Sequence, residues 1–357
     1  MKRLPLAALL AAFFVFLVLS VSIRQAVLML IGVGMGAALA AARFGFTTGW
    51  RQLIEQRNPQ GVAGQVLLLA LASLAALPLL GQFSELHAAL GPPSVSLLVG
   101  AFVFGLTMQI ADGCGSGSLY KAGLGVPLNM GILPLFALGS FLGSVHLDSW
   151  LSLGQTAPVS FSAVYGTGGA LALTLALLAA VLVAVRLWVG AGQSWFDKRW
   201  VWGAVALAVL ATLNLLLAGQ PWGVVYGFGL WAAKISVALG AFEPATNAFW
   251  DQAGNAQRLT QTVFKDVTTI TNIGILGGAL WVSAKSPTGS KPLTTQQWVI
   301  GLVAGFVMGY SSRLAFGCNI GAMLSGISTG SLHGWLWVPL AFAGTLIGVR
   351  VRRYYQF

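Results

Sequence analysis

The stretch RLAFGCNIG, residues 313–321, interrupts an apolar segment where a membrane helix should continue. A second stretch, IADGCGSGS at 110–118, does the same 204 residues earlier (318 − 114 = 204, from cysteine to cysteine). These stretches hold the only two cysteines of the chain, Cys114 and Cys318. Non-helical backbone at membrane depth is tolerated only where it is buried in protein or lines a cavity. The sequence therefore predicts a protein-enclosed break in each of two helices.

The composition is that of an integral membrane protein. Of the 357 residues, 57% are hydrophobic and only 8% are charged, whereas soluble domains carry roughly a quarter of charged residues. The net charge of +11 comes from basic residues scattered between apolar segments, without the basic patch of nucleic-acid-binding proteins. Two cysteines are too few for a closed zinc site, and no nucleotide-binding or metalloprotease motif is present. We therefore expect no nucleic acid, metal or cofactor.

Apolar segments of about 20 residues mark membrane-spanning helices. We predict an all-α polytopic membrane protein with about nine transmembrane helices and short re-entrant half-helices. The candidate segments are 4–22, 26–42, 63–81, 95–111, 130–147, 166–188, 200–218, 222–240, 267–284, 297–312 and 335–350. The segment 222–240 fits poorly as a full crossing and is predicted to be re-entrant or broken. We interpret residues 1–22 as an uncleaved first helix, with a cleaved signal peptide as the alternative.

The chain contains an internal repeat. Both cysteine segments have the pattern Gly-x5-Ala-x-Gly-Cys-x-x-Gly, and the following segment also aligns after one inserted residue. The matched pairs are Gly105 and Gly309, Ala111 and Ala315, Gly113 and Gly317, Gly117 and Gly321, Pro134 and Pro339, Gly139 and Gly344, and Gly143 and Gly348. A match that includes both cysteines is unlike a chance alignment of glycines. We predict two copies, over about 95–147 and 297–350.

The charges around the copies predict that their topologies are inverted. The first copy is flanked by Glu85, His87, His146 and Asp148, and the second by Lys285, Lys291, Arg350, Arg352 and Arg353. Cytoplasmic loops of membrane proteins carry an excess of Lys and Arg. The first copy should therefore open and close outside, and the second inside, with a cytoplasmic C-terminus. Inverted repeats with interrupted helices near the midplane are typical of transporters, so residues 1–357 form one integral membrane transport domain.

The breaks supply the candidate site. If a short helix restarts after each cysteine, its free N–H groups and positive dipole end can bind an anion. The candidate residues are Gly113, Cys114, Gly115, Gly117, Gly317, Cys318, Asn319 and Gly321. The alternatives are close helix packing with the thiols as small buried hydrophobes, or a disulfide between them. Lys121, Lys234 and Arg313 are candidates for attracting the anion, with snorkelling or a Lys–Asp pair as the alternative.

Four segments resemble the YeeE/YedE family of bacterial sulfur transporters. They are GCGSGSLYKAG (113–123), YGFGLWAAK (226–234), DVTTITNIGILGGAL (266–280) and RLAFGCNIGAMLSGISTGSLHGWLW (313–337). The resemblance implies an inner-membrane transporter, and not an enzyme, whose inverted halves form an hourglass-like central path. It also implies that Cys114 and Cys318 touch the substrate in passing. Gly45 stands where family members often have a third cysteine, and Leu124 replaces a frequent glutamate.

The resemblance implies uptake of thiosulfate, or a closely related small sulfur anion, across the bacterial inner membrane. A selenium compound, another sulfur anion and a membrane thiol-redox protein are the alternatives. We expect the thiols to stay protonated, because a thiolate would repel an anion, and a neutral S–H is a weak donor suited to a soft sulfur. Besides the sulfur anion and membrane lipid, a small cytoplasmic sulfur-carrier protein is the expected partner.

Overall fold

The computed structural model describes residues 3–284 and 292–357, and within them the chain forms helices and no strand. Its elements are α1 (Arg3–Ser20), α2 (Ile23–Ala42), α3 (Phe46–Gln56), α4 (Gln60–Gln82), α5 (Val95–Ile110), α6 (Gly115–Gly123), α7 (Pro127–Val145), α8 (Leu147–Leu151), α9 (Phe161–Val189), α10 (Lys198–Ala218), α11 (Val225–Ala238), η1 (Pro244–Thr246), α12 (Ala253–Thr260), η2 (Val263–Lys265), α13 (Val267–Ser283), α14 (Thr295–Leu314), η3 (Asn319–Ser325), α15 (Gly326–Ser328) and α16 (Leu332–Tyr354).

The helices confirm the predicted fold class. In the described part of the chain, nine helical stretches are long and apolar enough to cross a membrane. Helices α11 and α13 are shorter, with 14 and 17 residues. The polar stretch 43–62 contains one helix that was not predicted, α3, whose apolar residues Phe46, Trp50 and Leu53 are buried. Because polar residues alternate with its apolar residues, this amphipathic helix contains no long apolar segment of the kind that marks a membrane-spanning helix.

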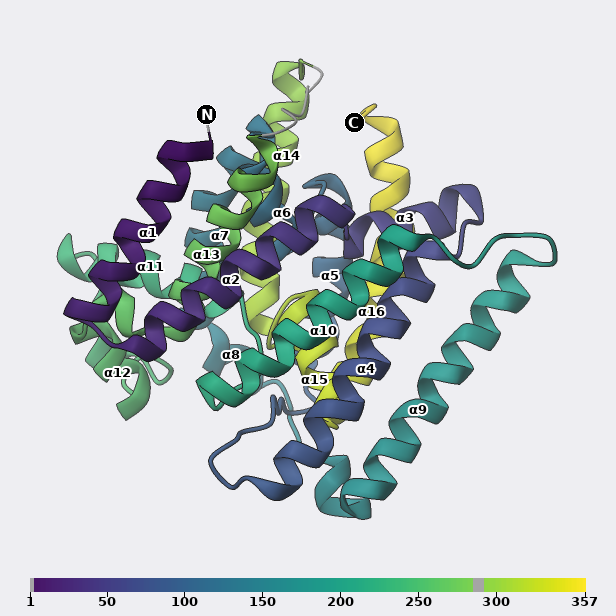
Figure 1. Cartoon of the computed structure of the whole chain (residues 1–357), viewed down its shortest axis with the longest axis horizontal. Coiled ribbons are helices and arrows are strands. Elements are labelled where there is room, and N and C mark those ends of the chain that lie inside the picture. Colours follow the sequence, from purple (N-terminus) through teal and green to yellow (C-terminus); the bar gives the residue numbers. More distant parts are fainter. Residues whose placement is uncertain (1–2, 285–291) are drawn as a thin grey trace.

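The two chain ends mark one face of the molecule. Both termini lie at the same end, at the top of Figure 1, whereas α8, α12 and the segment after α4 lie toward the other end. We call these ends the terminal face and the opposite face. The last turn of α16 carries Arg352 and Arg353 at the terminal face. Lys285 and Lys291, which contribute to the predicted orientation, lie outside the described residues.

Glycine lets three helix pairs approach until their backbones touch. These pairs are α2 with α13, α5 with α16, and α7 with α14. In the first pair, a Cβ added to Gly36 would lie 2.0 Å from the carbonyl oxygen of Ile275, and one added to Gly278 would lie 2.0 Å from that of Val33. Apolar side chains gain little from leaving lipid, so close backbone packing of this kind drives helix association in membranes.

The close contacts of the two cysteine-containing segments recur in pairs. A Cβ on Gly105 would meet the carbonyl oxygen of Ala341, and one on the matched Gly309 would meet that of the matched Phe136. The same correspondence relates two further pairs of contacts, Gly139 on Phe306 with Gly344 on Phe102, and Gly143 on Tyr310 with Gly348 on Leu106. Helices α5 and α7 thus pack on α16 and α14 through equivalent positions.

We predict that Gly105→Ala and Gly309→Ala each destabilise the protein. Their new Cβ atoms would lie 1.9 and 2.2 Å from carbonyl oxygens, so the packed helices must separate, at a cost of about 1–3 kcal/mol. Thermal unfolding in detergent should show a lower Tm for both variants. Gly168→Ala is the matched control, because a Cβ at Gly168 meets no atom within 4 Å. An unchanged Tm in both variants would contradict the close packing.

Candidate functional site

The two breaks have the same backbone course. Helix α5 ends at Ile110 and α14 at Leu314, and each is followed by a residue in the left-handed region, Asp112 (φ 53°) and Phe316 (φ 56°). The hydrogen bond from Gly113 N–H to Met108 O is 3.0 Å long, and the matched bond from Gly317 N–H to Ser312 O is 2.8 Å long. Both helices are interrupted at the residues that the sequence predicts.

Glycine is required before each cysteine. A Cβ on Gly113 would lie 2.8 Å from the backbone nitrogen of Ser118, and one on Gly317 would lie 2.5 Å from that of Ala322. Gly317 also has a φ of +149°, which side chains other than hydrogen disfavour. These two glycines let the chain turn back tightly, so that the next helix begins directly after the cysteine. Gly321 is less crowded, since its nearest neighbour is the oxygen of Phe316 at 3.8 Å.

The two cysteines lie together in the interior, each as the cap of a short helix. Cys114 caps α6 and Cys318 caps η3, and both free thiols are buried. The Cβ position of Gly115 lies 3.4 Å from Cys318 Sγ, and that of Gly117 lies 3.5 Å from Cys114 Sγ. The Cys318 thiol thus packs against the first residue of the helix that Cys114 caps. The sequence predicts both thiols on one central path, and this contact brings them to one place.

The polar atoms around the thiols leave donors free. The backbone N–H of Ile320 donates to Cys318 Sγ at 3.4 Å, so the S–H of that cysteine remains available. Cys114 Sγ lies 3.5 Å from Ser116 Oγ. Asn319 is completely buried, and neither its side-chain oxygen nor its side-chain nitrogen has a hydrogen-bond partner among the described residues. An unsatisfied buried polar group costs about 1–3 kcal/mol, which a bound ion or water would offset.

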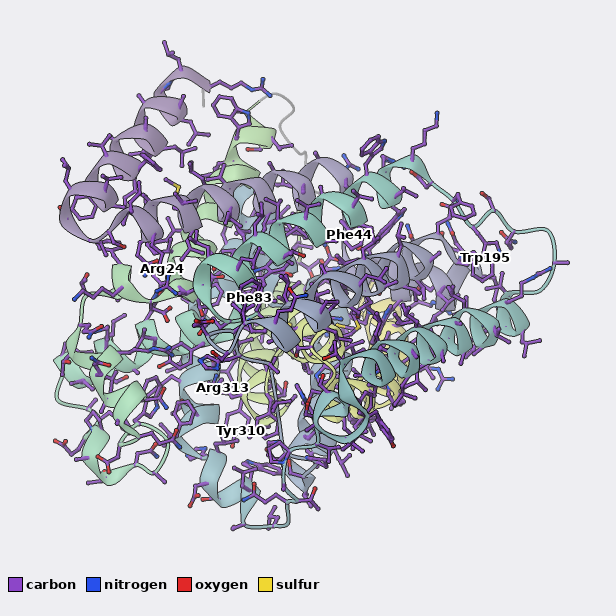
Figure 2. All side chains as sticks on the ribbon, turned by 60° about the horizontal axis from the view of Figure 1, so that its bottom comes forward. Arg24, Phe44, Phe83, Trp195, Tyr310 and Arg313 are labelled. Carbon is purple, nitrogen blue, oxygen red and sulfur yellow. The ribbon has the colours of Figure 1, made fainter. Side chains whose placement is uncertain are left out.

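Arg313 lies toward the opposite face, because it shares the ring of Tyr226 with Arg258 of α12. Its guanidinium carbon stacks 4.7 Å from the ring centre of Phe249 and 5.7 Å from that of Tyr226. Arg258 of α12 stacks on the same tyrosine ring at 4.9 Å. The buried Arg313 Nε has no hydrogen-bond partner, and Arg313 forms no salt bridge within the described residues. Figure 2 labels Arg313 close to Tyr310, and both residues belong to α14.

The two lysine candidates both have structural partners. Lys121 Nζ lies 2.7 Å from the Asp112 carboxylate and also donates to the Asp112 carbonyl. Lys234 Nζ donates to the carbonyls of Leu259 and Gln261, at 2.5 Å each. Lys234 therefore anchors the end of α12 to α11. Lys121 belongs to a larger group of charges around Asp112 on the terminal-face side of the thiols.

Sequence reasoning missed several residues around the thiols. Phe136 and Val224 lie beside Gly115, where an added Cβ atom would be 3.3 Å from Phe136 and 3.5 Å from Val224. Phe136 directly follows the aligned Pro134 and Leu135, so the repeat could have indicated it. The partners of Asp112 besides Lys121 are Arg51 and Arg352, and neither arginine was predicted as a site residue. No pattern in a single sequence connects these distant residues.

A family model described as sulphur transport matches residues 41–347. The chain belongs to this family. It is 28% identical to the thiosulfate transporter TsuA of Spirochaeta thermophila over 331 residues, which cover 86% of this chain and 93% of that protein. It is 22% identical to the thiosulfate transporter TsuA of Escherichia coli over 353 residues, 90% of this chain and 94% of that protein. The probable transporter YedE of Salmonella typhimurium is 26% identical over 164 residues, 44% of this chain and 39% of YedE.

Family membership confirms the resemblance to YeeE/YedE proteins. It also confirms that the protein is a membrane transporter and not an enzyme. The description of the family, sulphur transport, indicates a sulfur compound as the transported substrate.

We predict that Gly115→Ala impairs transport more than it impairs folding. The added methyl group would lie 3.3–3.5 Å from Phe136, Cys318 Sγ and Val224, so it fits tightly but fills the space beside the thiol. Uptake of radiolabelled thiosulfate into vesicles should fall at least about tenfold, a barrier of roughly 1.4 kcal/mol. The Tm in detergent should stay within a few degrees of the wild-type value. Gly254→Ala is the control, because Gly254 is an uncrowded glycine, and it should leave uptake unchanged. Equal uptake by both variants would contradict the placement of Gly115 beside the transport path.

Proposed function

We propose that the protein takes up thiosulfate, or a closely related small sulfur anion, across the bacterial inner membrane, and that the anion passes along Cys114 and Cys318. The observation that carries this proposal is the close approach of Cys318 Sγ to Gly115, where an added Cβ atom would lie 3.4 Å from the sulfur. It brings two thiols and two helix starts to one buried place. The names of the two TsuA relatives support thiosulfate as the substrate.

The chemistry at the breaks suits a soft dianion. Moving one charge into a medium of low dielectric costs up to about 20 kcal/mol in the idealised Born treatment, so fixed donors must replace the water shell. The N–H groups at the start of α6 and η3 supply positive partial charge without a mobile counter-ion. Neutral S–H groups are weak donors. Weak contacts are favourable here, because conduction requires that the ion also leaves.

Cationic side chains lie at both ends of the path from Arg313 through Cys318 and Cys114 to Asp112. On the opposite-face side, the Nε of Arg313 has no hydrogen-bond partner in the described part of the chain. On the terminal-face side, Lys121 and two arginines share the single carboxylate of Asp112. An anion arriving from either side therefore meets positive charge before it reaches the thiols. Such fields raise the local concentration of an oppositely charged substrate.

The proposal includes inverted repeats around an hourglass-like path and a cytoplasmic terminal face. The paired contacts of α5 and α7 with α16 and α14 support the repeat. The excess of basic residues at the terminal face, among them Arg51, Arg57, Arg352 and Arg353, supports the orientation. This orientation places the C-terminus in the cytoplasm, where a small sulfur-carrier protein is the proposed partner. A selenium analogue of thiosulfate has the same charge and a similarly soft terminal atom, so it remains the alternative substrate.

We predict that Cys114→Ala and Cys318→Ala each reduce thiosulfate uptake at least about tenfold, whereas the two Cys→Ser variants retain more activity. A hydroxyl group can replace the S–H donor, but a methyl group cannot. The assay is entry of radiolabelled thiosulfate into vesicles that contain only this protein, with protein-free vesicles as the baseline. Equal insertion and equal Tm of all variants must be shown first. Wild-type uptake by both Ala variants would exclude the thiol path.

We predict that Arg313→Gln raises the KM for thiosulfate uptake about tenfold and changes the maximal rate less. Glutamine is polar but uncharged, so it removes the charge that attracts the anion at the opposite face. Increasing ionic strength should raise the KM of the wild type more than that of the variant, because salt screens the attraction between the anion and Arg313, which only the wild type has. Arg199→Gln is the control, since Arg199 is exposed and paired with Asp197. The same KM shift in both variants would contradict a specific role of Arg313.

A further inference from the structure

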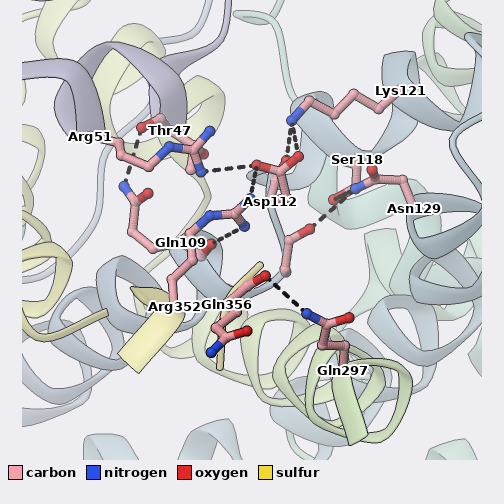
Figure 3. A network of polar contacts seen from close by, with 11 residues as sticks. Thr47, Arg51, Gln109, Asp112, Ser118, Lys121, Asn129, Gln297, Arg352 and Gln356 are labelled. Atoms are coloured by element: carbon pink, nitrogen blue, oxygen red, sulfur yellow. Dashed lines mark hydrogen bonds and ion pairs between the residues drawn. The ribbon is translucent and has the colours of Figure 1, made fainter. Parts of the chain in front are cut away.

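Asp112 is the centre of a group of four charges between the thiols and the terminal face. Its Oδ1 lies 2.9 Å from Arg51 Nη1 and 3.4 Å from Arg352 Nη2, and its Oδ2 lies 2.7 Å from Lys121 Nζ. Figure 3 shows the three cationic side chains converging on this one carboxylate from α3, α6 and α16. Within the described residues, none of the three forms another salt bridge. The group therefore has a net charge of +2 (3 − 1 = 2).

The group borders a space that can hold an anion. Of the four charged groups, Asp112 and Arg352 line a pocket of about 360 Å³ together with Asn129, and the other walls of this pocket are mainly apolar. A water molecule occupies about 30 Å³ of the liquid, so the cavity has room for a small oxyanion and several waters. Asn129 is fully buried and donates to Ala111 O at 3.2 Å and to Ser118 Oγ at 3.4 Å, and its Oδ1 has no hydrogen-bond partner among residues 3–284 and 292–357. These bonds tie the cavity wall to helix α6, which Cys114 caps.

The carboxylate is not needed to form the break itself. The matched position in the second copy is Phe316, with almost the same φ, 56° against 53° for Asp112. A phenylalanine thus occupies the same left-handed backbone conformation without any charge. Asp112 and Phe316 differ in side chain although their backbones agree. The Asp112 carboxylate is therefore not required for the turn, and it interacts instead with the charges on the terminal-face side of the path. Asp112 is only two residues from Cys114, which puts the charged group next to the thiols.

We propose that the Asp112 carboxylate is a tethered counter-anion that competes with the transported anion for Arg51, Lys121 and Arg352. When no substrate is present, the carboxylate neutralises part of the cationic site. An incoming dianion displaces it, and the return of the carboxylate releases the dianion toward the terminal face. Without this competitor, three cations would hold a dianion too tightly for rapid release. This proposal rests on the proposed function and assigns a second anion site beyond the thiols.

The first test is Asp112→Asn, measured by equilibrium binding of radiolabelled thiosulfate to the full-length protein and by uptake into vesicles. With an internal competitor, the apparent Kd equals the intrinsic Kd divided by the fraction of time that the site is free of the competitor. Removing it should lower the Kd roughly tenfold, and slower release should reduce the maximal uptake rate. Asp197→Asn is the matched control, because Asp197 forms its ion pair with Arg199 elsewhere, and it should change neither value.

A second variant separates competition from net charge and also guards against misfolding of the first. The double substitution Asp112→Asn with Arg51→Gln keeps the net charge at +2 (2 − 0 = 2) but has no tethered carboxylate. We expect it to bind thiosulfate more tightly than the wild type and to release it more slowly. A Kd in the folded double variant that equals or exceeds the wild-type Kd would overturn the proposal that Asp112 is a tethered counter-anion. An unchanged Kd in Asp112→Asn would also overturn it.

The same measurements distinguish this proposal from the proposed function. A wild-type protein that transports thiosulfate, together with Asn variants that keep the wild-type Kd and rate, would refute only the role of Asp112. A wild-type protein that neither binds nor transports thiosulfate would refute both. Sulfate at equal concentration reports on selectivity. Stronger inhibition by sulfate in Asp112→Asn than in the wild type is expected, since the emptied cationic site accepts any small oxyanion, and unchanged inhibition would count against the proposal.

Discussion

The constraint on which the structure depends is that a helix interrupted inside a membrane must satisfy its free backbone groups within the protein. At Asp112–Cys114 and Phe316–Cys318 the chain does so by a tight glycine turn, after which α6 and η3 begin at once. The N–H groups at these starts are held near two thiols and the side-chain amide of Asn319, which has no hydrogen-bond partner in the part of the chain that the structure describes. Helix pairs in glycine-mediated contact enclose the breaks. The backbone N–H groups that each break leaves free are therefore fixed polar groups inside the protein, at a depth where lipid would otherwise exclude an ion.

The charges on the two sides of the thiols are of different kinds. Arg313 on the opposite-face side stacks on aromatic rings and has no carboxylate partner within the described residues. On the terminal-face side, the Asp112 carboxylate neutralises part of the combined charge of three cationic side chains. The matched backbone at Asp112 and Phe316 shows that one scaffold can carry different side chains on its two sides. In our account, one side captures the anion and the other governs its release, with weak thiol contacts between them.

Sequence reasoning predicted the helices and the breaks because both follow from local rules. Apolar length indicates the spans, and Gly113 and Gly317 beside the only cysteines indicate the interruptions. It missed α3, whose buried Phe46 and Trp50 lie among polar residues. It also missed the charge group, because Arg51, Asp112 and Arg352 come from segments far apart in the chain and meet only after α3, α5 and α16 have packed. It left Lys121 and Lys234 open between substrate attraction and structural pairing, and only the folded contacts provide their partners.

The account's central claim is that a small sulfur anion lies between Cys114 and Cys318 on its way through the protein. Selenosulfate, in which selenium replaces the terminal sulfur of thiosulfate, would locate it by anomalous scattering in crystals of the wild-type protein. The account predicts a selenium peak in contact with both thiols, at a concentration at which selenosulfate competes with thiosulfate uptake. An additional peak beside Asp112 would agree with the second anion site, whereas the absence of any peak beside Cys114 or Cys318 would contradict the account.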